Sequence, residues 1–134
     1  MLKQSVFHHI GVAVFKIEDT VPYYIQAGYS ISEIVIEPVQ LVRVVYARKE
    51  GCPMIELLEP LNETSPICSI LRSRGVGPYH ICYAVPDIQA AALEMKNSKF
   101  TPLAKPVPGH GLDDALTAFF YNKNVGLIQL VEIK

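Results

Sequence analysis

The chain contains 134 residues, of which 50% are hydrophobic and 19% are charged, so it folds rather than staying disordered and is long enough for one domain or two half-size units. Its 12 basic and 13 acidic residues give a formal charge of -1, and this balance, without any run of like charge, argues against nucleic acid as a partner. The longest apolar stretches, Ile10 to Phe15 and Ala115 to Tyr121, are far shorter than the roughly 20 residues of a membrane span, which argues against a membrane as well.

The N-terminal residues and the cysteines bear on the cellular compartment. Residues 1–5 (MLKQS) lack the apolar run and the cleavage site of a signal peptide. Cys52, Cys68 and Cys82 are odd in number and have no paired spacing, which argues against a disulfide framework. Both observations predict a soluble cytoplasmic protein.

The first half of the chain is predicted to contain a helix and four strands. A strand at residues 9–15 precedes a helix that Asp19 or Thr20 caps. Pro22 then lies in the first turn, where its missing N–H costs nothing, and Gly28 ends the helix. Strands follow at residues 29–36, 41–48 and 54–58. A short linker helix over about residues 65–75 begins at Ser65-Pro66 and ends at Gly75.

The second half is predicted to repeat this order. A strand at residues 80–85 leads into a helix over residues 88–96 that Asp87 caps, and strands follow at residues 100–105, 115–121 and 127–133. The sequence itself repeats: residues 7–14 (FHHIGVAV) return as residues 78–85 (PYHICYAV), and residues 55–59 (IELLE) return as residues 128–132 (IQLVE). Two βαβββ modules, about residues 7–60 and 78–133, are therefore predicted within a single α+β domain over residues 1–134.

Strand alternation places four metal-capable side chains at equivalent positions of the two modules. In the first strand, His9 lies on the face opposite Ile10 and Val12, which suit packing under the helix. A lone strand histidine is usually a core or edge residue, and a lone strand glutamate usually faces solvent, but four such side chains at equivalent positions indicate a metal site. Two imidazoles, a carboxylate and an amide oxygen suit one divalent ion: zinc, nickel, cobalt or manganese. The predicted ligands are His9, Glu56, His80 and Gln129.

The motifs around these residues resemble a known superfamily. Over essentially its whole length the chain is similar to the vicinal oxygen chelate superfamily, which includes glyoxalase I, bleomycin-resistance proteins and extradiol dioxygenases. Within it, residues 55–61 (IELLEPL), 65–67 (SPI) and 79–81 (YHI) most resemble the methylmalonyl-CoA epimerases. The resemblance implies a glyoxalase-like fold, in which two βαβββ modules form a curved mixed-sheet half-barrel with a cleft around the metal. It also places the family's ligands on His9, Glu56, His80 and Gln129.

Two departures from the family pattern concern proton transfer and substrate binding. The fourth ligand of glyoxalase I and of the epimerases is typically glutamate, whereas Gln129 carries an amide, which cannot act as a base. The epimerases' glycine-rich stretch with a basic residue is replaced here by residues 108–114 (PGHGLDD). The catalytic candidates are Glu56 and Gln129, other candidate bases are Glu37, Glu59 and His110, and the candidates for binding the substrate are Arg43 and His110.

These residues predict a metal-dependent isomerase or lyase that acts α to a carbonyl, by enediolate chemistry on an acyl-CoA or other thioester. Three alternatives remain open. The first is a non-catalytic small-molecule binding protein of the bleomycin-resistance type, which Gln129 favours. The second is a lactoylglutathione lyase like glyoxalase I. The third, an Fe(II) dioxygenase with two histidines and one carboxylate, is less favoured, because the carboxylate of those enzymes comes from the final strand, where this chain has Gln129. The sheet edges that βαβββ modules expose predict a homodimer.

Overall fold

The computed structural model describes residues 2–134 and has the α+β fold predicted from the sequence. Residues 9–79 form one compact unit, and residues 2–8 together with residues 80–134 form another. We call these the first unit and the second unit. The first unit contains residues 9–60 of the predicted first module and the second unit residues 80–133 of the predicted second module, and helices and strands follow in a similar order in both. No helix in the described part of the chain is long and apolar enough to cross a membrane.

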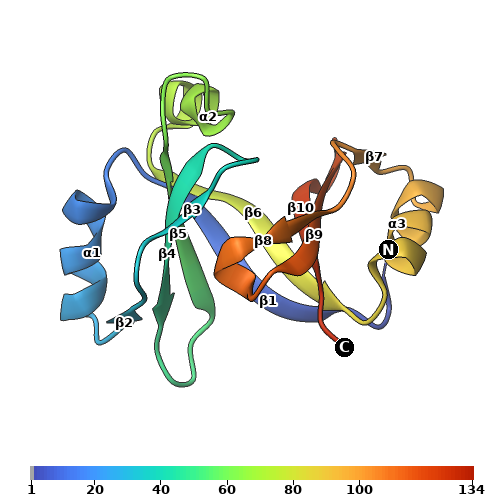
Figure 1. Ribbon diagram of the computed structural model, residues 1–134, viewed down its shortest axis with the longest axis horizontal. Helices are drawn as coiled ribbons and strands as arrows, with labels where there is room; N and C mark the ends of the chain where they lie inside the picture. The colour runs from blue at the N-terminus through green and yellow to red at the C-terminus, as the bar shows by residue number, and fades with distance from the viewer. Residues whose placement is uncertain (1) are drawn as a thin grey trace. The chain divides into compact units, whose positions relative to one another are not determined.

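The first unit builds its sheet in the order β2-β4-β5-β1, with β3 beside β4 (Figure 1). Strands β4 and β5 form an antiparallel hairpin, and β1 pairs with β5 in parallel. Helix α1 contacts β2, β4 and β5, and α2 contacts β5. The bounds are β1 (Val6–Ala13, in this unit from His9 on), α1 (Ile17–Gln26), β2 (Ser30–Ile31), β3 (Val35–Glu37), β4 (Val42–Arg48), β5 (Met54–Pro60) and α2 (Ile67–Arg74).

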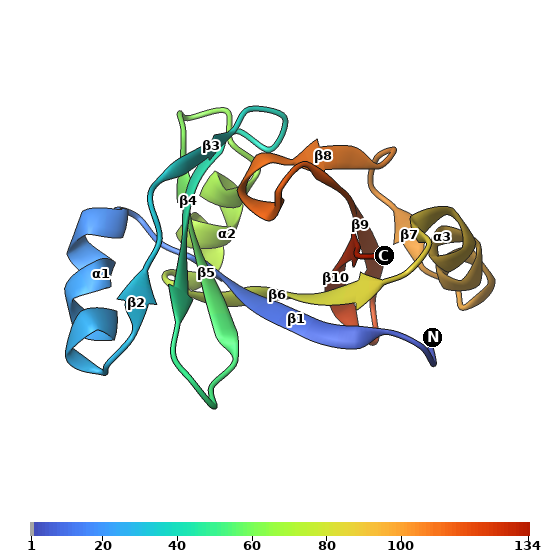
Figure 2. The same ribbon diagram turned by 60° about the horizontal axis from the view of Figure 1, so that its bottom comes forward.

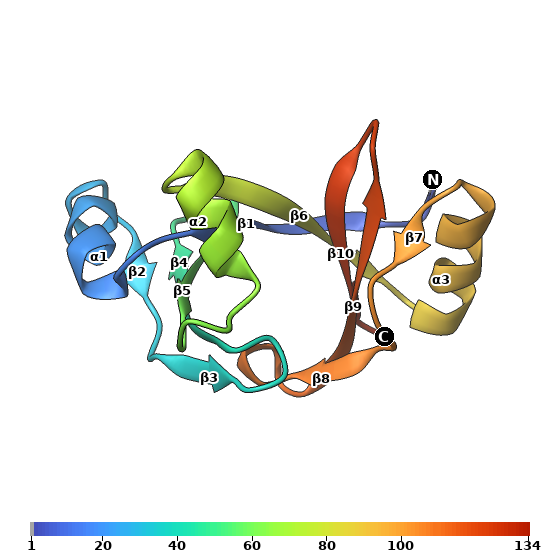
Figure 3. The ribbon, with the colours of Figure 1, turned by 90° about the horizontal axis from the view of Figure 1, so that it is seen from above.

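The second unit has the corresponding order β6-β10-β9-β7, with β8 beside β9. Figure 3 shows the antiparallel hairpin of β9 and β10, and Figure 2 shows α3 next to β7. Strand β6 pairs with β10 in parallel, as β1 does with β5. The bounds are β6 (Gly77–Val85, in this unit from His80 on), α3 (Ile88–Asn97), β7 (Thr101–Pro102), β8 (Val107–Gly109), the short 3-10 helix η1 (His110–Leu112), β9 (Ala115–Asn122) and β10 (Gly126–Glu132).

Helices α1 and α3 each pack on the apolar face of the sheet in their own unit, as the strand alternation predicts. In the first unit Val12, Val14 and Leu57 are buried with Ile17 of α1. Burying a side chain of this size contributes roughly 1.5–3 kcal/mol, so this layer fixes which face of β1 and β5 is left for polar residues. The second unit has the equivalent layer: Val85, Ile88, Ala91, Met95, Phe100, Ala118, Phe120, Ile128 and Leu130.

The predicted start of α1 is wrong, because its cap comes from a distant strand. The helix begins at Ile17, and neither Asp19 nor Thr20 is its N-cap. Instead, the N–H of Ile17 donates to Oε1 of Glu59 in β5, over 2.8 Å. Pro22 therefore lies inside the helix rather than in its first turn, where it removes one helical hydrogen bond.

The second unit repeats this contact. The N–H of Ile88 donates to Oε2 of Glu132 in β10, over 3.0 Å. Here the predicted cap is also confirmed, since the side chain of Asp87 accepts from the N–H groups of Gln89 and Ala90. In both units a carboxylate at the end of the last strand thus binds the first N–H of the helix.

The long second strand predicted in each module is wrong: residues 29–36 contain β2 and the start of β3 instead of one strand, and of residues 100–105 only β7 is a strand, with β8 lying beyond them. In the first unit the hydroxyl of Ser32 accepts a hydrogen bond from the N–H of Tyr46 in β4, over 2.8 Å. At this point, after β2 and before β3, a side chain therefore replaces a backbone carbonyl as the partner of β4. In the second unit Pro102 and Pro106 lack the N–H that a continuous ladder needs. The predicted helix ends are confirmed, since Gly28 and Gly75 have positive φ angles of 95° and 73°.

Candidate metal centre

The first unit holds a buried His–Glu pair. Nε2 of His9, from β1, lies 3.1 Å from Oε1 of Glu56, from β5. His9 is fully buried and Glu56 is 4% exposed. Parallel pairing sets Gly11 opposite Glu56, so a residue without a side chain lies beside the carboxylate. A buried carboxylate is costly unless it is hydrogen-bonded or binds a cation, so this pair is a candidate for chemistry.

Tyr46 completes the group from the neighbouring strand. It lies directly opposite Glu56 in the antiparallel register of β4 and β5, and its hydroxyl donates to Oε2 of Glu56 over 2.8 Å. Its ring also meets the ring of His9 edge to face, with 5.9 Å between centroids. The two oxygens of Glu56 therefore face different partners, one an imidazole nitrogen and the other a phenol.

The pKa of Tyr79, at the end of the first unit, is affected by the same carboxylate. Burial raises the pKa of its hydroxyl well above the usual value of 10.0, and the negative charge of Glu56 raises it further. Tyr79 is therefore a neutral phenol at physiological pH. Neither Tyr46 nor Tyr79 is predicted as a site residue from the sequence, because a neutral phenol is not a typical metal ligand.

The second unit presents the equivalent set of residues. Gln129 in β10 lies opposite Phe119 of β9 and Cys82 of β6, and His80 meets Phe119 edge to face with 5.2 Å between ring centroids. His80 and Gln129 are 3% and 2% exposed. Within the described residues, Oε1 of Gln129 has no hydrogen-bond partner. A buried carbonyl oxygen without a donor is a rare and costly feature that a bound cation would remove.

The donors in both units fit a divalent metal. An ion with bonds of about 2.1 Å holds neighbouring donor atoms about 3.0–3.4 Å apart, and the His9–Glu56 separation of 3.1 Å lies in that range. The amide oxygen of Gln129 provides an acceptor that no donor among residues 2–134 uses. Imidazole, carboxylate and amide ligands suit borderline ions such as zinc, cobalt, nickel or manganese.

The sequence and the fold both match a known family. Residues 8–119 match the glyoxalase/bleomycin resistance protein/dioxygenase superfamily. The chain belongs to this superfamily. This assignment confirms the resemblance predicted from the sequence, and members of this superfamily typically bind a divalent metal.

Similar members of the superfamily are methylmalonyl-CoA epimerases. The mitochondrial methylmalonyl-CoA epimerase of Homo sapiens is 33% identical over 131 residues, which cover 95% of this chain and 72% of the human protein. The crystal structure of methylmalonyl-CoA epimerase from Mycobacterium tuberculosis superimposes with a TM-score of 0.86 at 25% identity, over 100% of this chain and 93% of that one. A Streptomyces coelicolor epimerase variant in complex with 2-nitronate-propionyl-CoA has a TM-score of 0.81 at 25% identity, over 94% and 95% of the two chains.

Arg43, a candidate for binding the substrate of this superfamily member, lies in an ion-pair network. It projects from the sheet face opposite Tyr46 and Glu56, three positions away along paired strands. Its Nη1 donates to Oε2 of Glu59 over 2.7 Å, and its Nη2 donates to Oε1 of Glu18 over 3.3 Å. These two carboxylates raise the pKa of Arg43. The structure therefore brings Arg43 to the start of α1 rather than to the His9–Glu56 pair. Its partner Glu59, a candidate base, serves as the helix cap.

His110 and Glu37, the other candidates, lie elsewhere in their units. Nδ1 of His110 is 2.8 Å from Oδ1 of Asp114, and the imidazole is 49% exposed. Asp113 and Asp114 both have left-handed backbone conformations, with φ of 55° and 60°, which turns the chain from η1 into β9. Glu37 ends β3 and is 5% exposed. The substrate-binding role of His110 stays a prediction.

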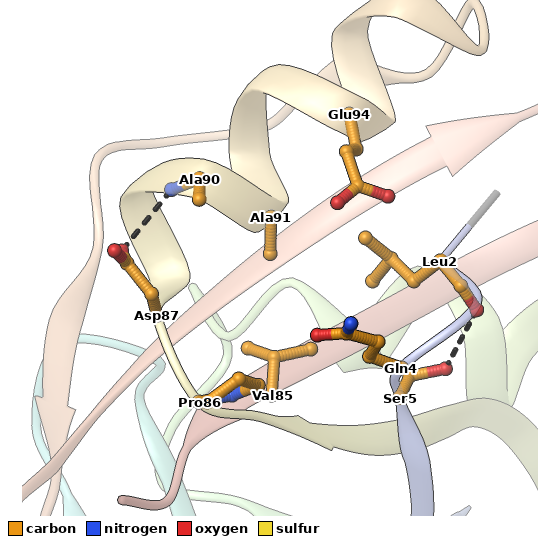
Figure 4. A pocket seen from close by; sticks show the side chains of 9 residues that line it. All are labelled: Leu2, Gln4, Ser5, Val85, Pro86, Asp87, Ala90, Ala91 and Glu94. Carbon is orange, nitrogen blue, oxygen red and sulfur yellow. Dashed lines mark hydrogen bonds between the residues drawn. The ribbon is translucent and has the colours of Figure 1, made fainter.

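The second unit also has an open pocket of about 150 Å³ between α3 and residues 2–5 (Figure 4). Asp87, which lines it, is already engaged in capping α3. None of the predicted site residues lines this pocket, which is lined by Leu2, Gln4, Ser5, Val85, Pro86, Asp87, Ala90, Ala91 and Glu94.

Proposed function

We propose that this protein is a metal-dependent isomerase that removes and returns the proton α to the carbonyl of an acyl-CoA thioester, and that it acts on the class of substrate for which the methylmalonyl-CoA epimerases are named. The observation that carries the proposal is the buried His9–Glu56 pair, with 3.1 Å between its donor atoms. Support comes from the epimerases that cover nearly the whole chain at 25–33% identity. The proposed substrate, methylmalonyl-CoA or a related acyl-CoA, follows from the likeness to these epimerases.

We further propose that His9 and Glu56 of the first unit and His80 and Gln129 of the second unit are ligands of one divalent ion. When bound, such an ion supplies a Lewis acid for the negative charge that develops on a carbonyl oxygen. Glu56 is the one charged ligand of this set, so the charge of the ion and its ligands together is +1 rather than the zero of a site with two glutamates. A net positive site favours an anionic substrate.

The protein's own residues determine which group can accept the α-proton of the substrate. Gln129 has no basic atom and serves as a neutral oxygen ligand. Glu56 is the carboxylate of the set, and we propose it as the proton acceptor. Tyr79 stays protonated because burial and the charge of Glu56 raise its pKa, so it acts as a hydrogen-bond donor and not as a base. The burial of His9 and Glu56 keeps water from competing for the proton.

The test combines metal analysis with proton exchange. The purified protein is expected to bind one divalent ion per chain, and His9→Ala and His80→Ala should each abolish this stoichiometric binding, since each removes a direct ligand. In deuterium oxide the metal-loaded protein should exchange the α-proton of methylmalonyl-CoA, and the two variants should not. Arg72→Ala, on the exposed surface of α2 in the same unit and outside the ligand set, is the matched control and should retain the metal. Unchanged metal content in both histidine variants would contradict the proposal.

A binding protein of the bleomycin-resistance type is the second candidate, because Gln129 removes the carboxylate that moves protons in many relatives. Such a protein would bind the acyl-CoA in calorimetry without exchanging its α-proton. A hemithioacetal in the same exchange assay separates a glyoxalase-like lyase from an epimerase. Binding without exchange of either substrate therefore selects the second candidate.

A further inference from the structure

Tyr46 makes contacts with both metal-binding residues of the first unit. Its hydroxyl donates to Oε2 of Glu56 over 2.8 Å, and its ring packs edge to face on His9. The Tyr46 side chain is itself buried, with 2% exposure, and Cζ of Arg48 lies 5.5 Å from the centroid of its ring. Packing from several sides therefore fixes the orientation of the hydroxyl.

This hydroxyl distinguishes the two oxygens of Glu56. Oε2 is held by the phenol, whereas Oε1 points toward Nε2 of His9 at 3.1 Å. A carboxylate left to itself can bind an ion through one oxygen or through both. A hydrogen bond to one oxygen favours binding through the other, which leaves an additional coordination position open.

The second unit provides an internal comparison. Phe119 takes the place of Tyr46: it lies opposite the fourth candidate ligand in the same register and packs on His80 as Tyr46 packs on His9. Phe119 has no hydroxyl. Its partner Gln129 has a single side-chain oxygen, so no hydrogen bond is needed to determine which oxygen binds the ion. The phenol thus accompanies the carboxylate, and the plain ring accompanies the amide.

We propose that Tyr46 is a positioning residue, whose hydroxyl holds Oε2 of Glu56 so that Oε1 alone binds the metal beside Nε2 of His9. The inference rests on the proposed function, since it requires the metal. Its consequence is specificity for a substrate that chelates through two oxygens, because such a substrate needs two open positions on the ion.

The test uses cobalt(II) as a spectroscopic probe in the full-length protein. Tyr46→Phe should keep the fold, because the ring remains, and should weaken cobalt binding by about 10–100-fold, as is typical when a partner of a metal ligand is removed. The visible absorption spectrum of bound cobalt should also change, since the second oxygen of Glu56 becomes available to the ion. Tyr24→Phe is the matched control: Tyr24 packs on the helix side of the same sheet, and its loss of a hydroxyl should leave affinity and spectrum unchanged.

A double-variant comparison tests whether Tyr46 acts through Glu56. In a Glu56→Gln background, where the ligand has one oxygen, Tyr46→Phe should alter cobalt affinity by no more than about twofold, because the two effects are then not independent. An equal loss in both backgrounds would overturn the positioning role.

Separate outcomes identify which proposal fails. If the wild-type protein binds no cobalt, the metal site fails and this inference falls with it. If wild-type protein binds cobalt but Tyr46→Phe has the same affinity and spectrum, the inference alone is overturned. Should Tyr46→Phe not fold, X-ray absorption of cobalt in the wild-type protein decides, because a carboxylate bound through both oxygens brings its carbon measurably closer to the ion, and that result overturns the proposal.

Discussion

Replacing Gln129 with glutamate exchanges an amide for a carboxylate with almost no change of shape. Gln129 is 2% exposed and lies opposite Phe119, which offers no hydrogen bond. Oε1 of Gln129 has no donor among residues 2–134, so without metal we expect the new carboxyl group to have a buried oxygen that lacks a hydrogen bond. Leaving such a group unsatisfied costs about 1–3 kcal/mol, and for a chain of this size that lowers the melting temperature by roughly 4–12 °C.

The cost should depend on pH in a definite direction. Burial disfavours the charged carboxylate, so the pKa of Glu at position 129 is raised above its unfolded value of about 4.3. A raised pKa means that the metal-free variant is closest to wild-type stability in acid and loses stability as the pH rises through that pKa. Adding the metal should remove the difference, because a bound cation stabilises the folded state that contains the charge.

Phe119→Tyr tests the physical reason for this cost. Combined with Gln129→Glu, it copies the Tyr46–Glu56 contact of the first unit, and a hydrogen bond to a charged group contributes about 1.5–3 kcal/mol. Thermal unfolding of the metal-free double variant should therefore recover most of the lost stability at pH 8. Equal stabilities of the single and double variants would refute the reasoning.

The same substitution tests catalysis. A positioned general base is worth about 10²–10⁴ in rate, so metal-loaded Gln129→Glu should exchange the α-proton of methylmalonyl-CoA faster than the wild type, as measured by deuterium incorporation. If wild type and variant exchange at the same rate, whether fast or not at all, then position 129 does not control proton transfer.

Three further predictions concern the scaffold. Glu59→Ala should lower the free energy of unfolding by about 2 kcal/mol, because α1 then loses the side chain that binds its first N–H. Glu132→Ala should lower it by only about 1 kcal/mol, because α3 keeps its Asp87 cap. Equal losses in denaturant titrations would contradict this. Tyr79→Phe should make the free energy of unfolding fall less steeply above about pH 10. The pKa of Tyr79 is raised in the folded protein, so its contribution to stability is fully present below its unfolded pKa and is lost as the pH rises toward the folded pKa. A pH dependence identical to that of the wild type would argue against this. Sedimentation should show a homodimer, and a monomer at micromolar concentration would count against that prediction.

Local patterns predicted most of the fold. The alternation of residues in β1 and β5 correctly separated Val12 and Leu57 from the polar face, because a strand reverses its side chains at every residue. The cap of α3 was also predicted, since Asp87 is adjacent to the helix it caps. The start of α1 was not, because its cap, Glu59, lies 42 residues away in the sequence.

The candidate site was predicted in its ligand types but not in its supporting residues. Alternation and the repeat selected His9 and Glu56, which the structure places in contact; their role as metal ligands stays a prediction. Tyr46 was overlooked because a phenol is a weak candidate ligand. Aligning Tyr46 with Phe119 across the repeat would have shown an aromatic residue opposite Glu56 in one module and opposite Gln129 in the other.

The carboxylate that binds each helix start also links that helix to a strand far along the chain. The first amides of a helix normally exchange their hydrogens quickly, because the terminal turn opens by itself. The amides of Ile17 and Ile88 are instead bound to residues 42 and 44 positions further along the chain. Opening them requires the last strand to separate from the helix, so their exchange rates report the loosening of a whole unit. These two amides are natural reporters of how independently the first and second units unfold.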